Sequence, residues 1–262
     1  MIEDKLHHFR SLFNKAEIVT LAFSGGVDST LLLYLLRHET SAAVKAVTVK
    51  TPYIPEWELA EAIEICRETD TEHAVIRLDI PDILINNPAD RCYLCKKELF
   101  SWIIDEAAKR GPGIIVDGTN SDDTGLHRPG LKALEELKIL SPLRDSGFTK
   151  GEIRELLRKY KPDMADKPAY SCLMTRLPYN TRVTRNVLEI IENGEQYIHS
   201  LGFPGTRLRV HGDIARIETS LKNLPEILSE PVRQSITEKI RSLGVRYVTI
   251  DLEGYRTGSM DT

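Results

Sequence analysis

The sequence has no apolar run long enough to cross a membrane and no excess of basic charge. Its 262 residues carry 35 Lys and Arg against 39 Asp and Glu, a formal net charge of −4. The stretch 1–13 mixes charged and apolar residues and lacks the apolar core of a signal peptide. No stretch reaches the roughly 18 apolar residues of a membrane span. We therefore expect a cytoplasmic protein with no membrane partner, and the charge balance argues against nucleic acid as a partner.

Cysteine is scarce. Four are present, Cys66, Cys92, Cys95 and Cys172. A reducing compartment disfavours a disulfide framework, so the close pair Cys92 and Cys95 indicates metal binding or redox chemistry. Cys66 falls on an apolar helical stripe with Leu59 and Ile63, and we expect it in the core.

The C-x-x-C pair has three ordinary interpretations, namely half of a zinc site, a redox pair or part of an iron–sulfur site. No second C-x-x-C follows, and the next cysteine is Cys172. Three cysteines without a fourth suit a [4Fe–4S] cluster that keeps one iron open. A zinc site of three cysteines and one histidine, either His127 or His211, is the alternative.

Strand-like and helical segments alternate through the first 160 residues. Strands are expected at 18–23, 42–50, 73–79, 113–120 and 137–140, and helices at 27–37, 55–70, 92–111 and 148–160. This alternation predicts a doubly wound, mainly parallel sheet of the Rossmann-like α/β class, covered by helices on both faces.

The pattern changes after this half. Residues 160–182 carry three prolines and no clear period. A helix at 187–202, paired strands at 207–219, a helix at 230–244 and a strand at 246–252 then predict a smaller α+β unit. We expect a nucleotide-binding domain at 1–165, a cysteine-bearing loop or linker at 166–182, and a C-terminal domain for substrate and oligomerisation at 183–262.

The motif SGGVDS begins at Ser24, where the first strand meets the first helix. Free backbone N–H groups and the helix dipole favour an anion there. Gly25 and Gly26 let the backbone wrap around phosphate oxygens, while Ser24 and Ser29 offer hydroxyl groups. The lysine of the Walker pattern is missing. Asp28 suits a magnesium ion held between carboxylate and phosphate. An ordinary glycine turn with an acid in the first helical turn is the alternative.

Two other segments offer polar side chains. DGTNSDD, with Thr119 and Asn120, follows the fourth strand, and ligands of open α/β sheets bind beyond the carboxyl ends of strands. A capped polar loop explains it equally well. Arg128 falls where a triphosphate could lie, or on the solvated surface. Arg207 and Arg209 project from one strand face, which suits phosphate capture but also an exposed sheet face.

The motif SGGVDS resembles the PP-loop of ATP pyrophosphatases. Together with KPAYSCLMTRLPY, RLRVH and DLEGYRTGSM, it resembles the LarE family, sulfur transferases that make the nickel-pincer nucleotide cofactor of lactate racemase. The resemblance spans nearly the whole chain. It implies a PP-loop domain followed by a smaller C-terminal domain. It also implies adenylylation of a carboxylate of a pyridinium biscarboxylate mononucleotide, after which sulfur replaces AMP.

The resemblance also assigns residues. Ser24, Gly25, Gly26, Asp28 and Ser29 match the family's ATP-binding loop. From their positions rather than from the resemblance, Thr119, Asn120 and Arg128 are also expected at ATP, with Mg²⁺ at Asp28. Cys172 matches the cysteine from which sulfur reaches the substrate, and Arg207 and Arg209 match the arginine pair at the substrate phosphate. The implied partners are a small nucleotide substrate, an external sulfide donor and further copies of the chain in a homo-oligomer.

The chain departs from the single-cysteine pattern of the best-known members, which sacrifice the sulfur of that cysteine. Cys92 and Cys95 resemble the cluster-bearing branch, and with Cys172 they could hold a [4Fe–4S] cluster that delivers external sulfide repeatedly. The alternatives are a sacrificial transferase that uses Cys172 itself and a tRNA thiolase with the same activation chemistry. The tRNA thiolase would need a basic RNA-binding surface.

Overall fold

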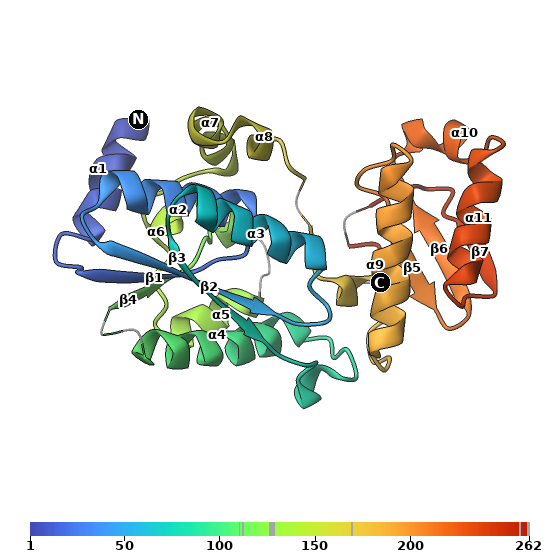
Figure 1. The fold of residues 1–262 in the computed structure, drawn as a ribbon, viewed down its shortest axis with the longest axis horizontal. Coiled ribbons are helices and arrows are strands. Elements are labelled where there is room, and N and C mark those ends of the chain that lie inside the picture. Colours follow the sequence, from blue (N-terminus) through green and yellow to red (C-terminus); the bar gives the residue numbers. More distant parts are fainter. Residues whose placement is uncertain (110, 112, 126–128, 169, 257, 261–262) are drawn as a thin grey trace. The chain divides into compact units, whose positions relative to one another are not determined.

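The computed structural model describes residues 1–109, 111, 113–125, 129–168, 170–256 and 258–260 (Figure 1). The chain forms two compact units. The first unit comprises 1–81 and 90–169, and the second comprises 82–89 and 170–262. None of the helices in the described ranges is long and apolar enough to cross a membrane.

The first unit is built on a parallel sheet of four strands in the order β3-β2-β1-β4. The strands are β1 Ile18–Ala22, β2 Ala43–Lys50, β3 Glu72–Arg77 and β4 Ile114–Val116. The central strand β1 pairs Val19 with Val44 of β2 and with Ile114 of β4. This confirms the predicted parallel, Rossmann-like sheet. The strand expected at 137–140 is wrong: Leu140 forms a single parallel bridge to Val116, because a short helix starts two residues later at Pro142.

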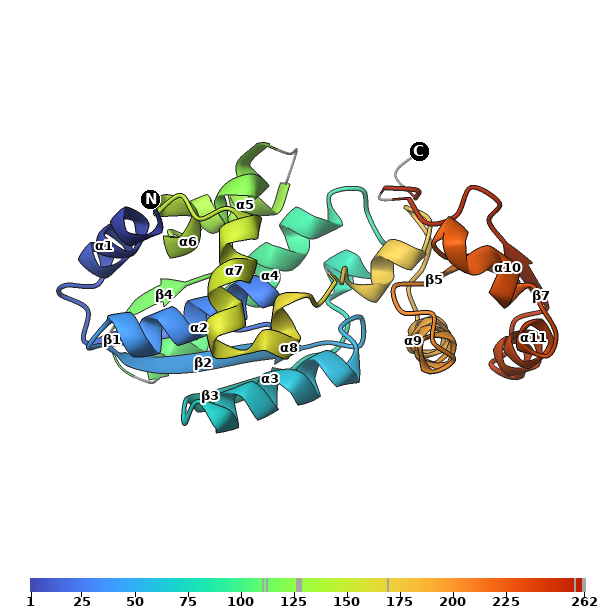
Figure 2. The ribbon, with the colours of Figure 1, turned by 90° about the horizontal axis from the view of Figure 1, so that it is seen from above.

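Helices cover both faces of this sheet (Figures 1 and 2). They are α1 Ile2–Leu12, α2 Val27–Glu39, α3 Glu56–Glu68, α4 Arg91–Lys109, α5 Pro129–Glu136, α6 Pro142–Asp145, α7 Lys150–Tyr160 and α8 Pro162–Ala165, with a 3₁₀ turn η2 at Ser121–Gly125. One core joins the sheet to α1, α2, α3 and α7, and another joins it to α4 and α5. The sheet is therefore buried on both sides, as its continuous apolar strands require.

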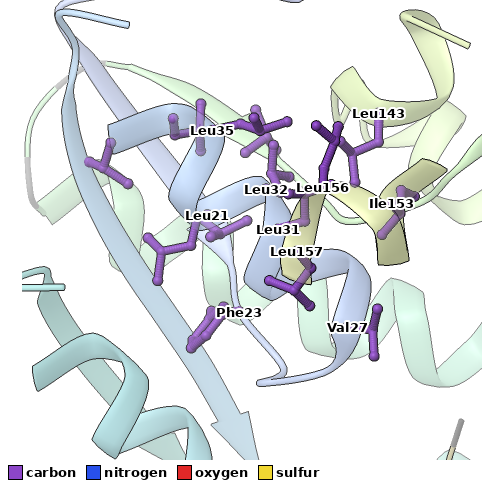
Figure 3. Close-up of a cluster of buried hydrophobic side chains, with 14 of the residues drawn as sticks. Leu21, Phe23, Val27, Leu31, Leu32, Leu35, Leu143, Ile153, Leu156 and Leu157 are labelled. Atoms are coloured by element: carbon purple, nitrogen blue, oxygen red, sulfur yellow. The ribbon is translucent and has the colours of Figure 1, made fainter. Parts of the chain in front are cut away.

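Helix α2 is the best-buried helix of this unit. Figure 3 shows Leu31, Leu32 and Leu35 packed between β1 and the leucines of α7, and all three side chains are at most 1% exposed. Burying one such side chain stabilises the fold by about 1.5–3 kcal/mol. This packing holds the N-terminus of α2, and with it the glycine loop, in a fixed place against the sheet.

The second unit contains a three-stranded sheet, β5-β6-β7, in which β5 and β6 are antiparallel and β6 and β7 are parallel. Its elements are η1 Asp82–Leu84, η3 Leu173–Arg176, α9 Arg185–Ser200, β5 Arg207–His211, β6 Ile214–Glu218, η4 Leu221–Asn223, α10 Leu224–Ile227, α11 Val232–Ser242 and β7 Tyr247–Ile250. A small α+β unit is what the pattern predicted.

The segment 82–89 belongs to this second unit although it lies between strands and helices of the first in sequence. The buried side chain of Asn87 donates hydrogen bonds to the carbonyls of Met174, Leu177 and Pro178, at 3.3, 3.2 and 2.9 Å. The backbone of Val183 also donates to the carbonyl of Ile85. These contacts fasten the segment that follows Cys172 to a distant part of the chain.

Candidate functional site

The loop between β1 and α2 needs glycine for steric reasons. Gly25 has φ +69°, and a Cβ there would lie 3.1–3.2 Å from atoms of Ala62 in α3. Gly26 is the N-cap of α2 in an extended conformation and provides no side-chain cap. The hydroxyl groups of Ser24 and Ser29 lie 3.0 Å apart across the loop. The N-terminal N–H groups of α2 are therefore available to an anion, flanked by two hydroxyl groups.

A cavity of about 330 Å³ opens at this loop, and every residue that lines it belongs to the first unit. Its lining includes polar residues and glycines of the loop and of the segment after β4, namely Ser24, Gly26, Asp28, Ser29, Asp117, Gly118, Thr119 and Asp123. It also includes apolar residues of β2 and α4, among them Val47, Val49, Leu99, Phe100 and Ile103. A space lined by both kinds of residue suits a ligand that joins a planar base to phosphate groups.

The end of β4 packs directly against the start of α2. A Cβ on Gly118 would lie 2.9 Å from the backbone nitrogen of Ser29, so glycine alone allows this approach. Asp117 accepts hydrogen bonds from the hydroxyl groups of Thr119, at 2.5 Å, and Ser141, at 2.6 Å. The structure thus brings the DGTNSDD segment to the glycine loop. Within this segment, the Thr119 hydroxyl group is already hydrogen-bonded to the Asp117 carboxylate.

Asp28 faces a lysine that the motif does not contain. The ammonium group of Lys150, at the start of α7, lies 2.5 Å from the Asp28 carboxylate, and the amide of Asn120 donates to the same carboxylate at 3.2 Å. A second ammonium group, that of Lys167, donates to the carbonyl of Gly25 at 3.5 Å. Two ammonium groups from distant segments therefore lie at the glycine loop, that of Lys150 paired with Asp28 and that of Lys167 paired with Glu61. Sequence reasoning missed both lysines: Lys150 belongs to no motif, and Lys167, although it opens the KPAYSCLMTRLPY segment, lies 142 positions from Gly25 in sequence.

Cys92 and Cys95 lie in the first turns of α4, separated by three positions and so on one face of the helix. Cys92 is exposed and Cys95 is half-buried. The Cys95 sulfur lies 3.3 Å from the hydroxyl group of Tyr53. Both thiols belong to the first unit, whereas Cys172 belongs to the second.

Cys66 is in the core, as predicted. It is 2% exposed, and burial raises the pKa of its thiol to about 12. The predicted stripe is wrong in one member, because Leu59 is buried with it but Ile63 is 45% exposed. A buried thiol with a raised pKa is unreactive, and burial distinguishes Cys66 from the other three cysteines.

Two predicted positions cannot be placed. Arg128, expected at the triphosphate, and His127, considered as a zinc ligand, lie outside the described residues. His211 lies at the end of β5 with its Nε2 buried and unpartnered. Within the described ranges, no group of three or more His, Cys, Asp or Glu side chains is arranged to hold a metal ion.

Arg207 and Arg209 are buried, at 3% and 5% exposure, so the exposed sheet face considered for them is wrong. Arg209 donates two hydrogen bonds to one carboxylate oxygen of Glu218, at 3.0 and 2.8 Å. Its remaining Nη1 donates to the carbonyl of Thr175, at 2.8 Å. The arginine thereby contacts the short turn that begins at Cys172.

The guanidinium group of Arg207 lies between aromatic rings, 4.7 Å from the ring centre of Tyr170 and 5.6 Å from that of Tyr255. Burial and the positive charge of Arg176 lower the pKa of Arg207. A buried guanidinium group beside aromatic rings is chemically suited to bind an anionic ligand group.

Comparison with known proteins agrees with this arrangement. Residues 14–90, which contain the glycine loop, match the asparagine synthase family. The chain is 35% identical over 246 residues to pyridinium-3,5-bisthiocarboxylic acid mononucleotide synthase of Lactiplantibacillus plantarum, covering 93% of this chain and 88% of that enzyme. The chain belongs to the LarE family.

Two uncharacterized proteins share this similarity. One is from Synechocystis sp. (31% identity, 100% of this chain and 98% of that protein), and the other is from Methanocaldococcus jannaschii (34% identity, 96% and 95%). The LarE similarity extends over both units, because it covers 93% of this chain. As a LarE family member, the protein is an ATP-dependent sulfur transferase.

Proposed function

We propose that the protein adenylylates a carboxylate of a pyridinium biscarboxylate mononucleotide and then replaces AMP with sulfur. The observation that carries the proposal is the cavity at the SGGVDS loop, which is lined by both polar and apolar residues. It occurs in a chain that matches a pyridinium bisthiocarboxylate synthase over nearly its full length. A carboxylate accepts a sulfur nucleophile only after one of its oxygens becomes a good leaving group, and adenylylation provides that group.

The activation step uses residues of the first unit. The N–H groups at the start of α2 and the hydroxyl groups of Ser24 and Ser29 would hold the phosphates and stabilise the pyrophosphate that leaves. Asp28 lines the cavity, so a magnesium ion there would be held by this carboxylate together with phosphate oxygens of the nucleotide. Bound there, the ion would supply charge neutralisation of the phosphates. Lys150 would then be released from Asp28 and could contact phosphate oxygens.

The transfer step uses residues of the second unit. Arg207 and Arg209 would bind the phosphate of the substrate, and Cys172 would present sulfur to the acyl carbon. In this step the new C–S bond forms while the bond between the acyl carbon and the AMP oxygen breaks. AMP leaves with the electron pair of that bond.

We further propose that Cys92, Cys95 and Cys172 hold a [4Fe–4S] cluster. The proposal is supported by the chemistry of these residues: cysteine thiolates are the usual ligands of such clusters, and none of these three thiols is buried, in contrast to Cys66. When bound, the cluster would supply an open iron that accepts external sulfide. Without it, Cys172 would have to give up its own sulfur and become dehydroalanine after one turnover.

One anaerobic experiment tests both proposals. The purified chain is incubated with ATP, Mg²⁺, sulfide and the biscarboxylate mononucleotide, and AMP, pyrophosphate and thiocarboxylate are measured by mass spectrometry. We expect equal amounts of AMP and thiocarboxylate. Pyrophosphate release without any thiocarboxylate would refute the proposed substrate.

Iron and acid-labile sulfide are measured in the same preparation, with C92A and C95A as test variants and C66A as the matched control. We expect about four irons per chain in the wild type and in C66A, and loss of iron in the other two. An iron-free chain that makes several thiocarboxylates per molecule would exclude the cluster. Loss of the mass of one H₂S from Cys172 after a single turnover would establish the sacrificial route.

A further inference from the structure

The ammonium group of Lys167 lies beside the glycine loop, within the first unit. Its Nζ donates to the carbonyl of Gly25, at 3.5 Å, and pairs with the carboxylate of Glu61 in α3. It also lies 4.9 Å from the ring centre of Trp57, about one turn earlier on the same helix. Only 13% of the lysine side chain is exposed. The packing of the first unit therefore fixes where this positive charge lies.

The backbone that carries Lys167 is held by α7. Arg154 of that helix donates from Nη2 to the carbonyl of Lys167, at 3.0 Å, and from Nη1 to the carbonyl of Ala165. The backbone N–H of Lys167 donates to the carbonyl of Met164, at 3.1 Å. Met164 and Ala165 are themselves buried in the core that joins the sheet to α2 and α7. The lysine side chain thus extends from a fixed point to the glycine loop.

This position suits contact with phosphate groups. Ser24 and Gly26, on either side of Gly25, line the cavity at the start of α2. A lysine ammonium group has three N–H donors on a flexible stem, so it can exchange one acceptor for another nearby. The carboxylate of Glu61 is 41% exposed, and water weakens an ion pair of this kind. The phosphate groups of ATP carry more negative charge than one carboxylate and compete with it for the ammonium group.

We infer that Lys167 is a phosphate-binding residue of the ATP site, which exchanges Glu61 for phosphate oxygens when ATP occupies the glycine loop. The inference rests on the proposed function, in which ATP binds at that loop. Lys167 precedes Cys172 in the KPAYSCLMTRLPY segment, so one continuous stretch of sequence would serve both activation and sulfur transfer. The alternative is an ion pair that only ties the end of the first unit to α3.

The first test is ATP binding to the full chain, measured by calorimetry with Mg²⁺ and without substrate or sulfide. The variants are K167M, which removes the charge but keeps an unbranched side chain, and E61Q, which removes only the counter-charge. K159M is the matched control, because Lys159 is exposed on α7 and its replacement removes the same charge.

K167M should bind ATP about tenfold more weakly or worse, because a phosphate group loses a charged donor. E61Q should bind ATP at least as tightly as the wild type, because the carboxylate that competes for Lys167 is gone. K159M should stay within about twofold of the wild type. Three results overturn the inference: wild-type affinity in K167M, equal losses in K167M and K159M, or weaker binding in both K167M and E61Q, as an ion pair that only supports the fold predicts.

The second test uses the wild-type chain and so does not depend on whether K167M folds. The chain is acetylated with acetic anhydride, with and without ATP and Mg²⁺, and the modification of Lys167 and Lys159 is compared by mass spectrometry. ATP should slow acetylation of Lys167 relative to Lys159 by about threefold or more, because phosphate holds the ammonium group. An unchanged ratio of the two rates overturns the inference.

Both tests are separate from the thiocarboxylate assay, because neither needs the biscarboxylate substrate. Normal ATP binding in K167M, in a chain that makes thiocarboxylate, would overturn the role of Lys167 alone. Weakened ATP binding in K167M, in a chain that makes no thiocarboxylate, would refute the proposed substrate and retain the role of Lys167.

Discussion

Substituting alanine for Gly25 should damage the first unit through two independent effects. The residue has φ +69°, a conformation that costs a residue with a Cβ about 1–2 kcal/mol. The new Cβ would also lie 3.1–3.2 Å from atoms of Ala62, including its backbone nitrogen and Cα. Packing of this kind costs about 1–3 kcal/mol. Together, the two effects predict a loss of about 2–5 kcal/mol in the free energy of unfolding.

The chain offers a specific probe for this loss. Its two tryptophans, Trp57 and Trp102, both belong to the first unit, so tryptophan fluorescence follows the unfolding of that unit alone. With a denaturant slope of about 2 kcal/mol per molar urea, the midpoint should fall by about 1–2.5 M. ATP binding, measured by calorimetry, should weaken at least tenfold, about 1.4 kcal/mol, because the N–H groups of the loop are displaced.

The matched control is Gly151→Ala in α7, where a Cβ would meet no atom within 4 Å. Alanine favours a helix over glycine by about 1 kcal/mol, so this variant should unfold at the same or a higher urea concentration and bind ATP normally. If Gly25→Ala keeps both the wild-type midpoint and the wild-type affinity for ATP, the steric account of the loop is wrong.

Three further predictions concern other parts of the chain. Because burial raises the pKa of Cys66 to about 12, iodoacetamide at about pH 8 should label Cys92 in the iron-free chain and leave Cys66 unmodified until urea is added; labelling of Cys66 in the folded, iron-free chain would contradict its burial. Burial and the charge of Arg216 lower the pKa of His211, so its contribution to stability is complete above about pH 6.5 and is lost as the pH falls toward the folded-state pKa. The urea midpoint of the wild type should therefore fall more than that of His211→Gln between about pH 7.5 and pH 5, and parallel curves would exclude this role. Asn87→Ala should destabilise the second unit by about 1–3 kcal/mol, because three carbonyls lose their donor, and faster amide exchange in β5 and β6 measures the effect; unchanged exchange would show that the segment 82–89 contributes little.

The sequence by itself determined the parallel sheet and the glycine loop between β1 and α2, because both depend on local order. Alternating strands and helices required a covered parallel sheet. Two adjacent glycines between an apolar strand and an apolar helix indicated that another group comes close to the backbone of this turn. The structure shows that approach at Gly25, which has a positive φ and packs against Ala62. The LarE family was also recognised from motifs that are continuous in sequence.

Tertiary structure decided which side chains meet. Lys150 pairs with Asp28, 122 positions away in sequence, and the Asn87 side chain is hydrogen-bonded to Met174, 87 positions away. No local sequence pattern predicts contacts between segments so far apart. The same limit explains why Arg207 and Arg209 were compatible with an exposed face. Period-two spacing shows that two side chains share a face of a strand, but only the packing of the rest of the chain decides whether that face is covered.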